Sequence, residues 1–222
     1  MGRKVKRFLD ILLSSLALLA LFPLLLIAAA GVKCSSPGPV FYRARRMGKD
    51  LRPFDVFKFR SMRTGADREG GITAAHDSRI FPFGAFLRKT KIDELPQLVN
   101  ILRGEMSIIG PRPEDVDIVL ESYTPEQKRT LEVLPGLASP GSIFNYTHGD
   151  RYLQGDDAEE DYIRELMPVK LDMDLYYVEH WSLLYDAELL FRTVYVIAAQ
   201  VLGKTEFPYP REYREEREPA VK

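Results

Sequence analysis

Residues 11–32 read ILLSSLALLALFPLLLIAAAGV, a run of 22 residues without a charged side chain. At a rise of about 1.5 Å per residue, one straight helix of this length would reach about 33 Å, enough to span the hydrocarbon core of a bilayer. The run is longer than the ~7–15-residue apolar core of a signal peptide, and no compelling small-x-small cleavage site lies near Lys33. The segment therefore predicts a membrane anchor.

Positive charge flanks this segment on both sides. The cations before it are Arg3, Lys4, Lys6 and Arg7, and those after it begin with Lys33 and Arg43. Because such flanks stay on the cytoplasmic side, both ends should face the same compartment. Pro23 lacks an N–H group and kinks or breaks a helix, which leaves two halves of about 16–18 Å each. We therefore expect residues 1–33 to form a re-entrant helix-break-helix anchor; a kinked helix that crosses once is the alternative.

The remaining chain has the composition of one globular domain. Of the 222 residues of the whole chain, 45% are hydrophobic and 28% are charged, which suits a folded core. The single Cys34 excludes an internal disulfide, and the three histidines are too far apart to suggest a metal site. We expect a folded domain over residues 34–204 and a polar, mobile tail over residues 205–222.

A net charge of −1 hides a strong division along the chain. Residues 1–112 hold 20 lysines and arginines against 9 acids, whereas residues 113–222 hold 11 against 23. A basic half of this kind can bind anionic lipid headgroups, a nucleotide diphosphate or nucleic acid. Nucleic acid is the weakest of the three, since no nucleic-acid motif accompanies the charge.

Short elements are predicted beyond the anchor. Residues 40–42 and 54–59 resemble two short strands around the turn at residues 48–50, which predicts a small β-hairpin. Residues 80–87 and 183–202 predict helices whose apolar faces suit either a protein core or a membrane interface. The expected fold class is α+β and mainly helical, with amphipathic helices around the site.

Two adjacent acids, Asp93 and Glu94, are the strongest candidates for chemistry. Neighbouring residues in a helix interior point about 100° apart, whereas neighbours at a helix start can serve one site. Asp93 suits an N-cap, Pro96 a first turn and Gly104 a stop, so we predict a helix over about residues 94–103. Its positive end would favour the ionised carboxylate and attract phosphate. The alternative is that Asp93 only caps the helix and that Glu94 is solvated.

An arginine in a stiff loop follows the acid pair. Arg112 stands in the sequence GPRP at residues 110–113, where the fixed φ angles of Pro111 and Pro113 restrict the chain. A guanidinium held in this way is a candidate phosphate clamp. An ordinary turn before a helix is the alternative.

Several separate blocks of the chain resemble one protein family. DELPQLVNILRGEMSIIGPRP (93–113), KFRSM (58–62), KRFLD (6–10) and KLDMDLYYVEHWSLLYDAELLFRTV (170–194) occur in the order seen in bacterial sugar transferases, the monotopic phosphoglycosyl transferases. The resemblance covers about residues 4–200. It implies transfer of a phosphosugar from a UDP-sugar to polyprenyl (undecaprenyl) phosphate, with release of UMP, as the first membrane step of bacterial glycan assembly. It also implies a location at the cytoplasmic face of the inner membrane, in contact with lipid.

The resemblance suggests roles for particular residues. Asp93 would attack the sugar-bearing phosphorus to form a covalent phosphosugar intermediate, which the lipid phosphate then attacks. Glu94, together with Asp93, would hold Mg²⁺. The expected phosphate contacts are Arg88, Arg112, Lys58 and Arg60.

Two other functions remain open at this point. The same reaction could proceed by direct attack of the lipid phosphate in a ternary complex, with both acids as metal ligands only. A non-catalytic membrane scaffold for glycan enzymes is the alternative from another class. The residues leave open the sugar, the glycan pathway and the oligomeric state, for which a homodimer is one option.

Overall fold

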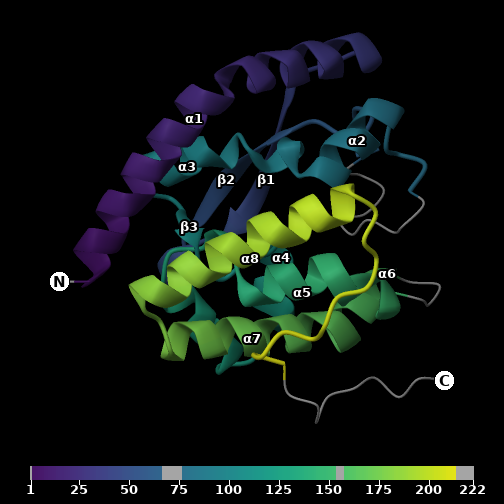
Figure 1. Ribbon diagram of the computed structural model, residues 1–222. Coiled ribbons are helices and arrows are strands. Elements are labelled where there is room, and N and C mark those ends of the chain that lie inside the picture. Colours follow the sequence, from purple (N-terminus) through teal and green to yellow (C-terminus); the bar gives the residue numbers. More distant parts are fainter. Residues whose placement is uncertain (1, 67–76, 154–157, 214–222) are drawn as a thin grey trace.

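A computed structural model describes residues 2–66, 77–153 and 158–213. It is mainly helical, with one antiparallel hairpin and a second, smaller sheet, as expected for the predicted α+β class. The long first helix runs along one side of the molecule, and the C-terminal helices lie below it in Figure 1.

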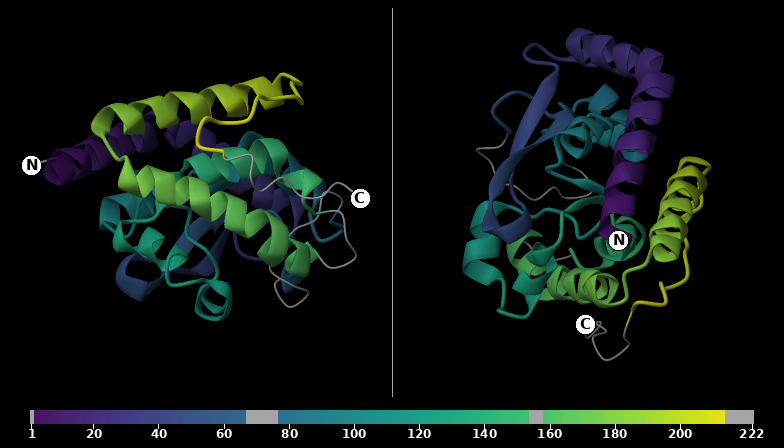
Figure 2. Two further views of the ribbon diagram at one scale, coloured as in Figure 1. Left: turned by 90° about the horizontal axis from the view of Figure 1, so that it is seen from below. Right: turned by 90° about the vertical axis from the view of Figure 1, so that its left-hand side faces the viewer.

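Helix α1 extends over Gly2–Ser35 and continues through Pro23. Its two halves follow different directions, and the bend between them is plain in the right-hand view of Figure 2. Pro23 removes one helical hydrogen bond and clashes with the preceding turn, which accounts for the bend. The predicted break is thus a bend within one helix, and the re-entrant path through a membrane stays a prediction.

The first turns of α1 are fastened to the rest of the molecule. The guanidinium of Arg7 donates to the carbonyl oxygens of Ile101 and Leu102, at 2.6 and 3.0 Å. The buried carboxylate of Asp10 accepts from the Ser107 hydroxyl at 3.1 Å and from the Ile108 N–H at 3.0 Å. These bonds satisfy backbone groups at the end of one element and the start of the next.

The predicted β-hairpin is confirmed. Strands β1 (Phe41–Met47) and β2 (Pro53–Phe59) pair antiparallel in the register Ala44↔Val56, around the short 3₁₀ helix η1 (Lys49–Leu51). Ala44 and Val56 are buried against the helix that follows the acid pair. The hairpin therefore provides a firm base under that helix.

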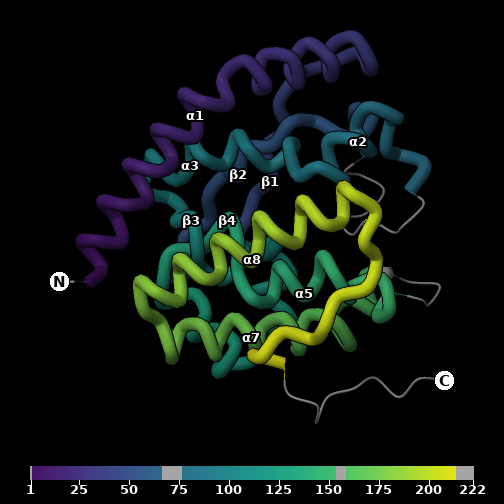
Figure 3. Tube along the Cα trace, in the orientation of Figure 1, coloured from purple at the N-terminus to yellow at the C-terminus, as the bar shows by residue number. Residues whose placement is uncertain are grey.

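Three short elements surround the acid pair. Helix α2 covers Pro82–Thr90, the 3₁₀ helix η3 covers Ile92–Glu94, and helix α3 covers Gln97–Arg103. Gly104 ends α3 with a φ of 84°, so the predicted stop is confirmed. Figure 3 shows α2 and α3 following one another between α1 and α8.

A second sheet holds the segment before the GPRP loop. Strands β3 (Ser107–Ile109) and β4 (Gly136–Ala138) pair in parallel. A side chain at Gly136 would place its Cβ 2.1 Å from the Gly110 nitrogen, so the two backbones approach as only glycine permits. Strands of three residues are too short to give a period-two pattern, and this sheet was not predicted.

The C-terminal half packs as helices around buried Phe144 and Leu166. Helix α8 is the predicted helix near residues 183–202. The elements are α4 (Val116–Ser122), η4 (Gln127–Glu132), α5 (Pro140–His148), η5 (Gly149–Arg151), α6 (Ala158–Asp161), the π-helical turn η6 (Tyr162–Leu166), α7 (Met167–Glu179) and α8 (Leu183–Val201).

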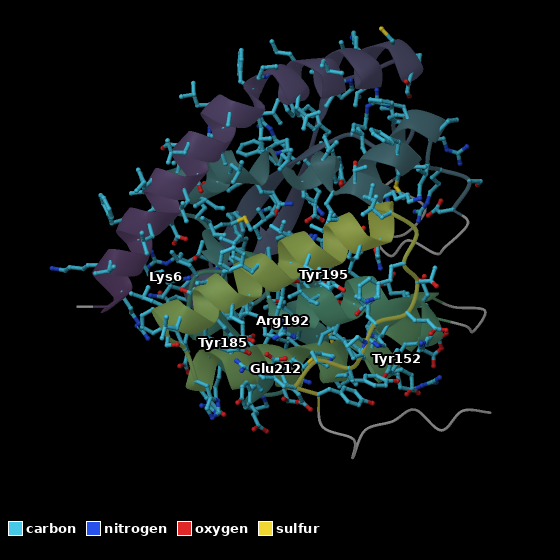
Figure 4. The ribbon with its side chains drawn as sticks, in the orientation of Figure 1. Lys6, Tyr152, Tyr185, Arg192, Tyr195 and Glu212 are labelled. Carbon is cyan, nitrogen blue, oxygen red and sulfur yellow. The ribbon has the colours of Figure 1, made fainter. Side chains whose placement is uncertain are left out.

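The segment expected as a mobile tail from residue 205 begins as a packed strap. Glu212 is buried, and its carboxylate accepts from the Tyr185 hydroxyl at 2.6 Å and from Arg192 at 2.7 Å. The three side chains are labelled in Figure 4. Charge pairing and the stacking of Tyr209 on His148 hold residues 205–213 against the helices. Residues 214–222 lie outside the described residues, and the domain boundaries stay a prediction.

Candidate active site

The acid pair lies in a tight turn between α2 and α3. Lys91 ends α2 in the left-handed region with a φ of 57°, and η3 follows at once. The sequence predicted that Asp93 is the N-cap of a helix starting at residue 94. The structure shows that this prediction is wrong, because Asp93 lies within η3. The N–H groups of Leu95 and Leu98 bond three residues back, so the chain stays in 3₁₀-type turns until α3 begins at Gln97.

Asp93 is buried but incompletely bonded. Its residue exposure is 6%, and its Oδ1 atom has no hydrogen-bond partner among the described residues. Burial, followed by the neighbouring charge of Glu94, raises the pKa of Asp93 to about 6, against the opposing effect of Lys58 and Lys91. A buried carboxylate oxygen without a partner is costly, unless it serves a ligand or a reaction.

Glu94 has a different environment from its neighbour. Arg112 donates from Nη1 to Glu94 Oε2 at 3.0 Å and from Nη2 to Oε1, which makes a two-point ion pair. Lys58 Nζ lies 3.6 Å from the same Oε1. Burial alone would raise the pKa of Glu94, but Arg112 and Lys58 outweigh it and hold that pKa far below its usual range. Glu94 is thus an ionised anchor for two cations, whereas Oδ1 of Asp93 has no hydrogen-bond partner among the described residues.

A small pocket opens beside this ion pair. Its volume is about 140 Å³, below the ~300–1,000 Å³ of a typical small-molecule site. Lys58 and Arg112 line it together with two further cations and the buried Gln97, whose Nε2 atom has no partner among the described residues. Basic side chains and an unused N–H donor suit the phosphate part of a larger ligand.

The predicted cations divide into two groups. Lys58 and Arg112 contact Glu94 directly, and Arg88 lies near enough to lower the pKa of Asp93. Arg60 is elsewhere: it is buried and donates to the carbonyl oxygens of Ser36 and Pro39 at 2.7 Å each. The structure therefore does not bring Arg60 to the acid pair. Its side chain instead ties the end of α1 to the hairpin.

Three residues at the site were not among the predicted site residues. Gln97 lines the pocket, and the charge of Lys91 acts on both acids. The buried Asp174 is a third, because its Oδ2 accepts from the Arg112 N–H at 3.3 Å and its Oδ1 from the Gly141 N–H at 3.0 Å. The adjacency of Gln97 and Lys91 to the acid pair could have pointed to them. Asp174 is distant in sequence and gave no such signal.

The donor set can be compared with what Mg²⁺ requires. This ion prefers six oxygens, usually one or two carboxylates supplemented by water and substrate phosphate. Oδ1 of Asp93 has no hydrogen-bond partner among the described residues, while both Glu94 oxygens already accept from Arg112 and each retains further lone pairs. Among the described residues no cluster of three or more acidic, histidine or cysteine side chains forms a metal cage. The pair fits an ion that arrives with a phosphate ligand.

The sequence is similar to a known protein family and to several known proteins. The sequence model of the family described as bacterial sugar transferase matches residues 1–200. A UDP-glucose:undecaprenyl-phosphate glucose-1-phosphate transferase from Escherichia coli strain K12 is 38% identical over 198 residues, which cover 87% of this chain and 40% of the relative. The exopolysaccharide production protein PSS of Rhizobium leguminosarum bv. phaseoli is 37% identical over 197 residues, covering 86% and 93%.

A third relative is named for a different sugar donor, UDP-N-acetylgalactosamine in place of UDP-glucose. The UDP-N-acetylgalactosamine-undecaprenyl-phosphate N-acetylgalactosaminephosphotransferase of Aeromonas hydrophila is 35% identical over 196 residues, covering 87% of this chain and 43% of the relative. The chain thus spans less than half the length of the Escherichia coli and Aeromonas relatives, and nearly all of PSS.

Proposed function

Since the chain belongs to the bacterial sugar transferase family, we propose that it transfers a phosphosugar from a UDP-sugar to undecaprenyl phosphate. The products are undecaprenyl diphosphate sugar and UMP. The names of the relatives support both substrates, and they include both glucose and N-acetylgalactosamine donors. The observation that carries the proposal is the buried Oδ1 of Asp93, which has no hydrogen-bond partner among the described residues, beside a Glu94 held by Arg112.

In the first step, Oδ1 of Asp93 attacks the sugar-bearing phosphorus of the UDP-sugar. A new oxygen–phosphorus bond forms, the bond to the UMP oxygen breaks, and UMP leaves with that electron pair. The enzyme then carries the phosphosugar on the carboxylate. Burial supports this role, because a poorly solvated carboxylate is a better nucleophile than one surrounded by water.

In the second step, an oxygen of undecaprenyl phosphate attacks the same phosphorus. The bond to Asp93 breaks, the carboxylate is restored, and the lipid carries the diphosphate sugar. Dividing the transfer in this way means that a water-soluble donor and a lipid acceptor need not be bound together.

The neighbouring cations reduce the repulsion between the anionic groups. Arg112 and Lys58 are already fixed by Glu94, so they can bind phosphate oxygens without first being ordered. Arg88 can approach from α2. Asp93 and Glu94 would hold Mg²⁺ together with the substrate phosphates, and this ion would neutralise charge on the transferring group.

The apolar surface supports a position at the membrane. Leu19 and Ile27 on α1 are 76% and 66% exposed, and Leu184 and Phe191 on α8 are 85% and 74% exposed. The starts of these helices are joined by the ion pair between Lys6 and Asp186, and both views in Figure 2 show the helices side by side there. We propose that the two helices contact the cytoplasmic leaflet and that α1 turns back within it.

The covalent route is tested with purified full-length protein in detergent. UDP-glucose and UDP-N-acetylgalactosamine are supplied in turn with Mg²⁺, but without lipid. The expected result with the correct donor is one UMP per protein and a phosphosugar mass on the peptide that contains Asp93. If UMP appears only when undecaprenyl phosphate is added, and no adduct forms, direct transfer in a ternary complex replaces this mechanism.

The scaffold alternative is tested by Asp93→Asn. This change removes the nucleophile but keeps the size of the side chain, so turnover should disappear while the protein stays in the membrane fraction. Unchanged turnover would refute the role given to Asp93. A wild-type protein that releases no UMP from any of a panel of UDP-sugars would favour the scaffold.

A further inference from the structure

The acid pair is preceded by a residue in an uncommon backbone conformation. Lys91 has a φ of 57° and a ψ of 15°, in the left-handed region that residues other than glycine seldom adopt. This residue forms the turn between α2 and η3. Its backbone conformation therefore sets the orientation of η3, which contains Asp93. Contacts from elsewhere in the molecule must hold it.

Tyr146 of α5 supplies such contacts. The Lys91 ammonium lies 4.2 Å from the centroid of the Tyr146 ring, a favourable cation–π distance. The Tyr146 hydroxyl donates to the carbonyl oxygen of Lys89 at 2.7 Å. One side chain thus binds both the backbone before the turn and the side chain at the turn.

Tyr146 is itself fixed by a second helix. Its carbonyl oxygen accepts from Nε2 of Gln200, near the end of α8, at 2.8 Å. The contacts therefore run without a gap from α8, through α5, to the turn that presents the acids. We expect a substitution at Tyr146 to change the conformation at Lys91 without changing the rest of the fold.

The charge on Lys91 reaches the acids. It is one of the three cations that oppose the rise in the pKa of Asp93, and it also contributes to the lowered pKa of Glu94. Lys58 approaches Glu94 from β2, whereas Lys91 belongs to the turn itself. The site therefore has cations from more than one segment of the chain, and one of them lies over an aromatic ring.

We propose that Tyr146 is a positioning residue, whose ring and hydroxyl hold the left-handed turn so that the Lys91 ammonium faces the acid pair and the substrate diphosphate. This inference rests on the proposed function, because it matters only if Asp93 and Glu94 act on a diphosphate. It assigns to Lys91 the role of binding phosphate oxygens, and to Tyr146 the role of keeping that cation in place.

The test is a double-mutant cycle in full-length protein, with UMP release measured in the presence of Mg²⁺, undecaprenyl phosphate, and UDP-glucose or UDP-N-acetylgalactosamine. The variants are Tyr146→Leu, Lys91→Met and the pair together. Each single change should lower kcat about 10-fold, in line with the loss of one desolvated cation–π contact. The double variant should be no slower than Lys91→Met, because both changes remove the same cation from the site.

Two further variants separate positioning from simple damage to the fold. Lys91→Arg keeps a cation that stacks on aromatic rings, so it should retain activity when Tyr146 is present and lose it in Tyr146→Leu. Lys89→Met is the matched control: it removes an exposed charge two residues away and keeps the carbonyl that Tyr146 binds. It should match wild-type kinetics and melting temperature.

The outcomes distinguish this inference from the proposed function. If the wild type releases UMP but the two single effects multiply in the double variant, Tyr146 and Lys91 act independently and the positioning role is wrong. If Tyr146→Leu lowers only the melting temperature, with kcat per folded protein unchanged, the role is also wrong. If the wild type releases no UMP from any UDP-sugar, the proposed function fails and this inference fails with it.

Discussion

Arg112 and Glu94 form a two-point ion pair although 18 residues separate them in the chain. The GPRP loop and the acid pair therefore belong to one site. The backbone N–H of Arg112 is also held, by the buried carboxylate of Asp174 on α7. Arg112 is thus held at both its backbone N–H and its guanidinium.

Replacing Arg112 by lysine should distinguish the contribution of its positive charge from that of its two-point contact with Glu94. Lysine keeps one positive charge but cannot bind both oxygens of Glu94 at once. We expect kcat/KM for UMP release to fall about 100-fold, on the order of the ~2.7–4 kcal/mol lost when one preorganised electrostatic contact is removed from an active site. Steady-state assays measure this loss. A variant within twofold of the wild type would show that Arg112 acts only as a point charge.

Removal of divalent cations should stop the reaction. Oδ1 of Asp93 has no hydrogen-bond partner among the described residues, and the proposed ion would reduce repulsion between carboxylate and diphosphate. We expect EDTA to lower UMP release by about 100-fold or more, and added Mg²⁺ to restore it. Full activity in EDTA would contradict the assignment of Mg²⁺ to this site.

Asp174 should make stability depend on pH. Burial, only partly opposed by hydrogen bonds from Gly141 and Ser139, raises the pKa of Asp174 to about 6 in the folded protein. The folded state then binds more protons than the unfolded state between about pH 4 and pH 6, so this group adds stability as the pH falls. The contribution is on the order of 3 kcal/mol at most.

The measurement compares wild type with Asp174→Asn, which does not titrate. Melting temperatures in detergent at a series of pH values give the difference between the two proteins. This difference should move in favour of the wild type as the pH is lowered from about 6 to about 4, and should be constant above pH 7. A difference that does not change with pH would refute the raised pKa.

Arg60 and Lys58 should respond differently to replacement by methionine. Arg60 donates to Ser36, Pro39 and Met62, so Arg60→Met leaves buried carbonyl groups without donors and should cost about 2–4 kcal/mol of stability. Lys58 contacts Glu94, so Lys58→Met should lower kcat instead. Thermal melting and UMP release per folded protein distinguish the two. Equal losses of kcat in the two variants would show that Arg60 also acts at the active site.

Much of the fold was predictable because it follows from patterns of apolar, polar and turn-forming residues that are close together in the sequence. The long apolar run became α1, the alternating stretches became the hairpin, and Gly104 ended α3. The second sheet was missed because its strands have three residues each and owe their pairing to the close approach of Gly110 and Gly136. The packing of residues 205–213 was missed because their polar composition resembles a tail, while it depends on the buried Glu212 binding Tyr185 and Arg192 of α8.

The site was predictable in its residue types but not in its geometry. Asp93 and Glu94 have the same local signal, yet one lacks a partner for Oδ1 and the other is held by two cations. No pattern of neighbours in the sequence distinguishes those two environments. The difference arises because Lys58 and Arg112, which belong to other parts of the chain, contact Glu94.

The amino-acid sequence by itself determined the long apolar helix, the position of its bend, the hairpin and the set of charged groups available for chemistry. Only the tertiary structure decided which cations reach the acids, since Arg112 faces Glu94 while Arg60 is used at the end of α1. The physical reason is that secondary structure follows from short-range sterics and hydrogen bonds, which neighbouring residues encode. Burial and charge pairing depend on contacts between distant segments, and these exist only once the chain has folded.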